Sequence, residues 1–170
     1  FVGTKRQAAG IVKDQAMRVG MPYLTQRWVG GLLTNWREIE KRIKKLHEMK
    51  EKREKGEYKV YTKKEQLLLD REIAKLEKFL GGVAGLVKLP DVLFVVDRHR
   101  EEVAVLEANR MGIPVIGIVD TNADPEKVDY VIACNDDAVK SVELVVRAVA
   151  QAIETGKAKK EITPPESPIL

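Results

Sequence analysis

Two short apolar segments separated by a helical pattern most constrain how this chain can fold. Residues 91–96 (D-V-L-F-V-V) and 115–119 (V-I-G-I-V) are almost entirely apolar, and residues 100–110 between them have the spacing of an amphipathic helix. A short strand over 130–133 and a helix over 138–154 continue the alternation. Apolar strands that alternate with helices are typical of a parallel sheet covered on both faces, so we predict an α/β fold.

The beginning of the chain adds another strand and helix to this pattern. Phe1–Thr4 has the character of the last part of a strand, so we expect the sequence to be a fragment that lacks preceding material. Thr4 and Gln7 have the spacing of a capping box. We therefore predict a helix over residues 5–19 that ends at Gly20, followed by a short extended piece.

From residue 35 the apolar residues recur every three or four positions, with charged residues between them. Gly56 lies between two such stretches, and Thr62 with Glu65 supplies a capping box for the second. The narrow stripes predict an antiparallel coiled-coil hairpin that projects from the core. The stripe residues are Trp36, Ile39, Ile43 and Leu46 in the first stretch and Leu69, Ile73, Leu76 and Leu80 in the second.

We therefore predict a discontinuous α/β core, an inserted hairpin and a short tail. The core comprises residues 1–34 and 81–160, and the hairpin comprises residues 35–80. Residues 161–170 are rich in proline, and we expect them to form an extended tail.

Charge and cysteine content limit the classes of function. Residues 1–78 contain 20 Lys and Arg against 11 Asp and Glu, whereas residues 79–170 contain 10 against 15. A basic first part is typical of a surface that meets a polyanion, and the acidic part is expected to face solvent or a protein. No apolar run approaches the roughly 20 residues that span a bilayer, so we expect no membrane contact. The single cysteine, Cys134, excludes an internal disulfide, and its apolar neighbours predict an inert, half-buried thiol.

The segment Q-R-W-V-G-G-L-L-T-N-W at residues 26–36 contains both tryptophans, on either side of a Gly-Gly pair. One interpretation is a structured loop whose backbone comes close to RNA, with Arg27 and Trp28 meeting phosphates or unpaired bases. The alternative is a tight turn that Trp28 or Trp36 pins to the core. The sequence leaves both interpretations open.

Other polar and basic groups gather in the same part of the chain, at the start of the first helix and on the predicted hairpin. Basic side chains neutralise phosphates, so we expect the lysines to set affinity for RNA. The candidate RNA-binding residues are Thr4, Lys5, Arg6, Arg27, Trp28, Asn35, Arg37, Lys41, Arg42, Lys44 and Lys45.

Acidic residues at the predicted strand ends support a competing hypothesis. Asp97 and Asp120 follow two apolar strands, where α/β sheets place ligand sites, so an α/β phospho-acceptor or nucleotide-dependent enzyme would use them. A divalent cation near Asp120, Asp124 and Asp136 is a related alternative. Capping and turn roles explain the same residues. Neither G-x-G-x-x-G after a strand nor G-x-x-x-x-G-K-[ST] occurs, so we expect no cofactor and no small-molecule substrate.

Five segments, in order and covering nearly the whole chain, resemble the bacterial ribosomal protein S2 family. They read V-G-T-K-R-Q-A, Q-R-W-V-G-G-L-L-T-N, P-D-V-L-F-V-V-D, E-A-N-R-M-G-I-P-V-I-G-I-V-D-T-N-A-D-P and V-D-Y-V-I-A-C-N-D-D-A. The resemblance implies a flavodoxin-like or Rossmann-like core with a protruding hairpin, in the cytoplasmic ribosome and without catalysis. It also implies binding to small-subunit rRNA and recruitment of ribosomal protein S1, for which Asp136 and Asp137 are a candidate surface.

Overall fold

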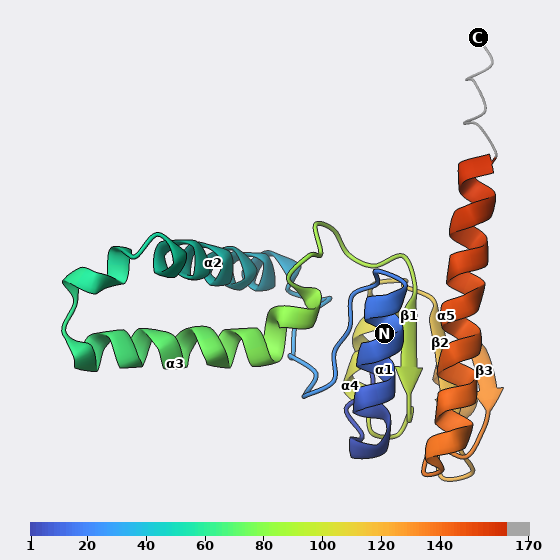
Figure 1. Ribbon diagram of the computed structural model, residues 1–170. Coiled ribbons are helices and arrows are strands. Elements are labelled where there is room, and N and C mark those ends of the chain that lie inside the picture. Colours follow the sequence, from blue (N-terminus) through green and yellow to red (C-terminus); the bar gives the residue numbers. More distant parts are fainter. Residues whose placement is uncertain (163–170) are drawn as a thin grey trace.

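The computed structural model of the chain describes residues 1–162, with side chains described for residues 1–159. This part contains five α-helices and a three-stranded parallel sheet (Figure 1), which confirms the predicted α/β class. The helices are α1 (Arg6–Arg18), α2 (Trp36–Glu54), α3 (Lys63–Leu80), α4 (Glu102–Arg110) and α5 (Val139–Ile162). The strands are β1 (Leu93–Val96), β2 (Val115–Val119) and β3 (Tyr130–Ala133), and short 3-10 turns cover Glu57–Val60, Gly81–Val83 and Pro125–Lys127.

The sheet has the order β1-β2-β3, with every described pair of strands parallel. Near the start of the chain, Val2 forms parallel bridges with Val95 of β1 and with Leu24. Of the two extended pieces expected around α1, the one at Val2 therefore lies beside β1, and the one at Leu24 lies on the other side of Val2. The loops that follow Val2, β1 and β2 come together at the carboxyl edge of the sheet, where α/β folds place their functional groups.

Two apolar clusters cover β1 and β2 from opposite faces. Phe94 and Val96 pack with α1 and α5, whereas Leu93 and Val95 pack with α4 and with the segment that contains Trp28. At β3 the prediction of full coverage is wrong: the side chains of Tyr130 and Val131 are 63% and 46% exposed. The reason is that β3 is an edge strand, and α4 packs on β2.

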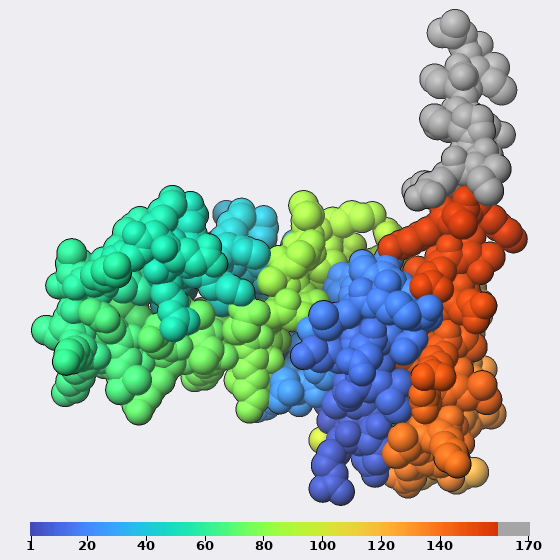
Figure 2. Space-filling view, in the orientation of Figure 1, coloured from blue at the N-terminus to red at the C-terminus, as the bar shows by residue number. Residues whose placement is uncertain are grey.

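Helices α2 and α3 lie side by side and project from the core as a hairpin (Figures 1 and 2). Leu46, Met49 and Ile73 form a small apolar cluster between them. The predicted capping box of α3 is confirmed, because Thr62 Oγ1 accepts a hydrogen bond from the amide of Glu65 and the Glu65 carboxylate accepts one from the Thr62 amide. A left-handed coiled-coil supercoil in this pair stays a prediction.

The predicted capping box at the start of α1 is wrong. The N-cap is Lys5, and no side chain caps the helix. Thr4 instead contacts the loop after β1: its amide donates to Glu101 Oε1 over 2.8 Å, and its hydroxyl accepts from Arg100 Nε over 2.9 Å. Tertiary contacts with residues almost 100 positions away therefore take the groups that the local spacing assigned to a cap.

Helix α5 is longer than the sequence predicts. It runs to Ile162 rather than ending near residue 154, so it includes the first two residues of the predicted extended tail. The rest of that tail, residues 163–170, lies outside the described residues. None of the helices in the described part of the chain is long and apolar enough to cross a membrane. Cys134 is half-buried, as predicted, and burial raises the pKa of its thiol, which keeps the thiol protonated and unreactive.

Candidate nucleic-acid interface

The segment with two tryptophans folds around one carboxylate from α4. Glu107 accepts hydrogen bonds from Trp28 Nε1 (3.0 Å), from the amide of Gly31 (2.7 Å) and from the amide of Leu33 (3.0 Å). The amide and the hydroxyl of Thr34 add two longer bonds, both of 3.3 Å. Five donors from one loop therefore converge on a side chain that is only 9% exposed. We call residues 26–35 the glycine loop.

This arrangement favours the tight-turn interpretation of the tryptophans. Trp28 is 8% exposed and its Nε1 is held by Glu107, and a contact of its ring with RNA stays a prediction. Trp36, half-buried, packs against the main apolar cluster where α2 leaves the core. Both rings therefore anchor the glycine loop and the hairpin. Arg27, which directly precedes Trp28, is exposed.

The electrostatics of Glu107 follow from these contacts. Burial raises the pKa of the carboxyl, but the hydrogen bonds from Trp28, Gly31, Leu33 and Thr34 outweigh burial, so the pKa lies below its ordinary value. The group is ionised at neutral pH, and a charged acceptor makes stronger hydrogen bonds than a neutral one. The glycine loop is therefore fixed in one conformation rather than free to adapt.

Lys5, another predicted RNA-binding residue, lies among carboxylates, and its contact with RNA stays a prediction. Its Nζ lies 3.3 Å from Asp97, 2.7 Å from Asp136 and 2.6 Å from Asp137. Burial lowers the pKa of Lys5, but the bonds to Asp136, Asp137 and Asp97 outweigh burial, so the pKa lies above its ordinary value. These ion pairs disfavour a contact between Lys5 and a phosphate. Of the two aspartates predicted to face a protein partner, Asp136 is 1% exposed, whereas the Asp137 side chain is 71% exposed.

The carboxylates do gather at the strand ends as the sequence indicates, but Lys5 occupies their centre. Asp97, in the left-handed region with φ 68°, and Asp136 flank the ammonium, and Asp120 accepts a hydrogen bond from the Asp136 amide over 3.3 Å. Asp124 Oδ1 caps the turn at Pro125–Lys127 by accepting from the Glu126 amide. A divalent cation at this cluster would have to displace the lysine.

A polar pocket of about 450 Å³ opens between the glycine loop and the start of α4. Arg27 and Gly30 line it from the glycine loop, Arg100 and Val103 line it from the start of α4 and the residues just before, and Thr4 lines it from the residues before α1. Both arginines are exposed. We call this the arginine pocket; its lining residues are Thr4, Gln26, Arg27, Trp28, Gly30, Arg100, Glu101, Val103 and Ala104. Arg6, also exposed, begins α1 two residues after Thr4.

The hairpin cations are exposed but mostly paired. Three of the five predicted hairpin cations have glutamate partners: Lys41–Glu38 (2.6 Å), Lys44–Glu40 (2.9 Å) and Lys45–Glu72 (2.6 Å). Such exposed pairs contribute only about 0–1 kcal/mol, so a phosphate can replace the glutamate at little cost. Within the described residues, Arg37 and Arg42 are exposed and form no ion pair; Asn35, also exposed, precedes α2.

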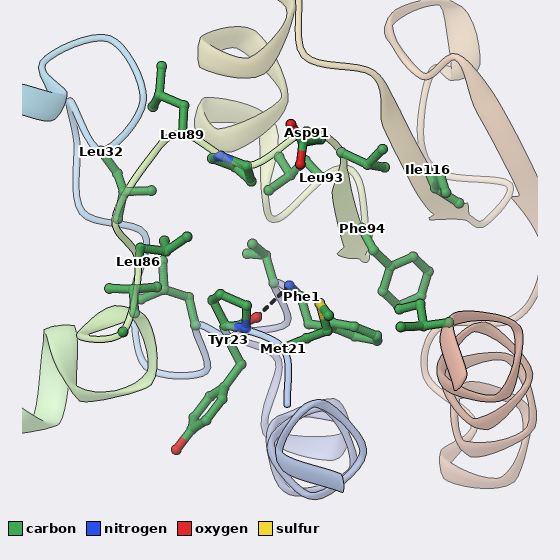
Figure 3. A pocket seen from close by; sticks show the side chains of 18 of the residues that line it. Phe1, Met21, Tyr23, Leu32, Leu86, Leu89, Asp91, Leu93, Phe94 and Ile116 are labelled. Carbon is green, nitrogen blue, oxygen red and sulfur yellow. Dashed lines mark hydrogen bonds between the residues drawn. The ribbon is translucent and has the colours of Figure 1, made fainter. Parts of the chain in front are cut away.

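A larger pocket lies at the opposite, amino-terminal edge of the sheet and has a different chemistry (Figure 3). It measures about 750 Å³, and apolar side chains such as Met21, Leu86 and Phe94 line it. Its charged lining groups, Lys88 and Asp91, pair with each other over 2.9 Å. With its lysine paired and its lining mostly apolar, this pocket is poorly suited to a phosphate.

A comparison with protein families agrees with these features of the fold and surface. The family model of ribosomal protein S2 matches residues 1–156 of the chain. The chain belongs to the ribosomal protein S2 family. This S2 family member is a ribosomal protein of the small subunit, where it takes part in translation as a structural constituent within a complex of rRNA and proteins.

Sequence reasoning missed three residues that shape the interface of this S2 family member. Glu101 and Glu107 are buried carboxylates that hold Thr4 and the glycine loop, and Arg100 supplies an exposed guanidinium. Glu107 lies on α4, and Arg100 and Glu101 lie just before it, in a stretch whose apolar spacing predicts a helix but not the contacts of its polar residues. A signal was present for Glu107, because it shares a helix face with Ala104 and Ala108, which are both fully buried.

Proposed function

We propose that this S2 family member binds small-subunit rRNA directly, through the arginine pocket and the first half of α2, and that it performs no catalysis. The observation that carries the proposal is the arginine pocket. Two exposed guanidinium groups, Arg27 and Arg100, border one cavity whose walls are tied to buried carboxylates. Arginine at a pre-ordered site suits phosphate recognition, since its rigid fork of donors matches the phosphate oxygens.

The hairpin adds a second, more extended contact in this proposal. Arg37 and Arg42 supply the unpaired charge on α2, and the glutamate-paired Lys41, Lys44 and Lys45 supply charge that phosphate can recruit. We also propose that the core belongs to the flavodoxin-like or Rossmann-like group and that the hairpin seam supercoils as a coiled coil. Family membership and the parallel sheet support the first point, and the apolar seam of Leu46, Met49 and Ile73 supports the second.

Salt dependence tests the hairpin contact. In the Arg37/Arg42→Ala variant, the slope of log affinity for small-subunit rRNA against log salt should become shallower by roughly 1.4–1.8, since each neutralised phosphate contributes about 0.7–0.9. The matched control is Lys127/Lys140→Ala, which removes two exposed charges from the acidic part of the chain that form no ion pair with any described residue. Filter binding across a salt series gives both slopes. Equal slopes for the two variants would contradict the hairpin contact, and no rRNA binding by the unchanged chain would contradict the proposed function.

We further propose that this S2 family member helps to recruit ribosomal protein S1, in the cytoplasm, through its acidic second part. Charge reversal at the exposed Glu126 (Glu126→Lys) should weaken retention of S1 by the immobilised chain several-fold. Charge reversal at the exposed Glu48 of the hairpin is the matched control and should leave retention unchanged. A pull-down titration measures both. Equal retention by the two variants would show that the acidic part is not the S1 surface.

A further inference from the structure

The walls of the arginine pocket come from three separate parts of the chain, and buried contacts fix all three. Glu107 holds the glycine loop through the amides of Gly31 and Leu33. Glu101, 2% exposed, accepts the amide of Thr4, so it ties the residues before α1 to the start of α4. A ligand that enters the pocket therefore meets groups that are already in position, which lowers the entropic cost of binding.

The donors that face solvent in this pocket suit a phosphate. Arg100 uses Nε to bond Thr4 Oγ1 over 2.9 Å, and within the described residues its terminal guanidinium nitrogens form no hydrogen bond or ion pair. Arg27, from the glycine loop, is exposed and also forms no ion pair within the described residues. Two guanidinium groups at one opening match the charge and the several acceptor oxygens of one phosphate.

The cavity is larger than a phosphate needs. At about 450 Å³ it falls in the range of roughly 300–1,000 Å³ that is typical of sites for small organic ligands. Val103, 54% exposed, supplies an apolar wall, and a Cβ placed on Gly30 would meet nothing within 4 Å. The pocket thus combines a cationic opening with an open space bordered by backbone and an apolar side chain, which suits a flat base.

We propose that the arginine pocket takes one nucleotide in an unstacked position of RNA, with its phosphate on Arg27 and Arg100 and its base between Gly30 and Val103. This inference rests on the proposed rRNA binding and adds the unit that is recognised. Unpaired nucleotides in loops and bulges present both a phosphate and a free base face, whereas a continuous duplex presents phosphates, 2′-hydroxyls and base edges but no free base face. A free mononucleotide has the same chemistry and is the other source of this ligand.

Filling the pocket without changing its charge is the sharpest test. Leucine at Gly30 has room and occupies the space assigned to the base, so Gly30→Leu should weaken binding to small-subunit rRNA by about tenfold, the equivalent of one stacked base. Gly10→Leu is the matched control, because Gly10 is exposed on α1 and also has open space around it. Its affinity should change by less than about twofold, as surface substitutions away from a contact do. A melting temperature of Gly30→Leu equal to that of the unchanged chain would show that the glycine loop is intact.

Removing a charge tests the phosphate contact separately. Arg100→Ala should make the salt slope shallower by about 0.7–0.9, whereas Arg110→Ala at the other end of α4 should leave it unchanged. Direct titration with AMP separates the sources: saturable AMP binding that Gly30→Leu abolishes, together with equal rRNA affinity of Gly30→Leu and Gly10→Leu, assigns the pocket to free nucleotides and overturns the RNA assignment. If the unchanged chain binds rRNA but Gly30→Leu and Arg100→Ala bind like their controls, the pocket inference fails and rRNA binding stands. If the unchanged chain does not bind rRNA, the proposed function itself fails.

Discussion

The Glu107→Gln variant should unfold with a free energy about 3 kcal/mol lower than that of the unchanged chain, because a buried donor left without its acceptor costs about 1–3 kcal/mol. An amide has one acceptor oxygen where the carboxylate has two, so its NH2 group would face donors. With either orientation of the amide, one buried donor loses its partner: Trp28 Nε1 bonds one carboxylate oxygen and the Leu33 amide bonds the other. Urea denaturation followed by circular dichroism measures the change.

Glu102→Gln provides the matched control, since Glu102 lies on the same helix and is exposed. Its free energy of unfolding should change by less than about 0.5 kcal/mol. If Glu107→Gln is as stable as this control, the five hydrogen bonds do not hold the glycine loop.

The two variants should also differ in their response to acid. The folded pKa of Glu107 lies below its ordinary value of 4.5, so its contribution to stability is present above that pH and is lost as pH falls through the folded pKa. The unchanged chain should therefore lose stability below pH 4.5 more steeply than Glu107→Gln, which has no proton to gain. Denaturation midpoints over a pH series compare the two slopes.

Replacing Lys5 with methionine should destabilise the core by about 3–5 kcal/mol, because removing one partner of a buried ion pair leaves an uncompensated charge. The ammonium is the shared partner of Asp97 and Asp136, whose side chains are 9% and 1% exposed. Lys13→Met, an exposed change on the same helix, is the control and should have little effect. Thermal melting measures both.

The Lys5→Met variant should also respond to divalent cations. Without the ammonium, Mg²⁺ becomes the natural counter-ion for Asp97 and Asp136, so millimolar Mg²⁺ should raise the melting temperature of Lys5→Met and leave that of Lys13→Met unchanged. If Lys5→Met melts at the same temperature as Lys13→Met, the carboxylates do not depend on the lysine.

Much of the fold follows from periodicity alone. The bounds of β2 and β3 and the capping box of α3 match the structure because apolar runs and local cap spacings determine them. The roles of Lys5 and Trp28 do not follow from local patterns. A lysine in the first turn of a helix looks the same whether it meets RNA or carboxylates, and the carboxylates of Asp97 and Asp136 come from distant strand ends. Local patterns in the sequence therefore predict the helices and strands better than they predict the side-chain contacts of Lys5 and Trp28.

The attachment of the hairpin to the glycine loop has a mechanical consequence. The Asn35 amide donates to the Gly31 carbonyl over 2.7 Å, and α2 begins at Trp36, only two residues after Thr34, which also bonds Glu107. The 19 residues of α2 extend about 28 Å from this point, at about 1.5 Å per residue. A tilt of about 10° at the base would move the far end of α2 by about 5 Å, more than the length of a hydrogen bond. Because Glu107 holds the loop from which α2 begins, its hydrogen bonds control the position of the far end of the hairpin.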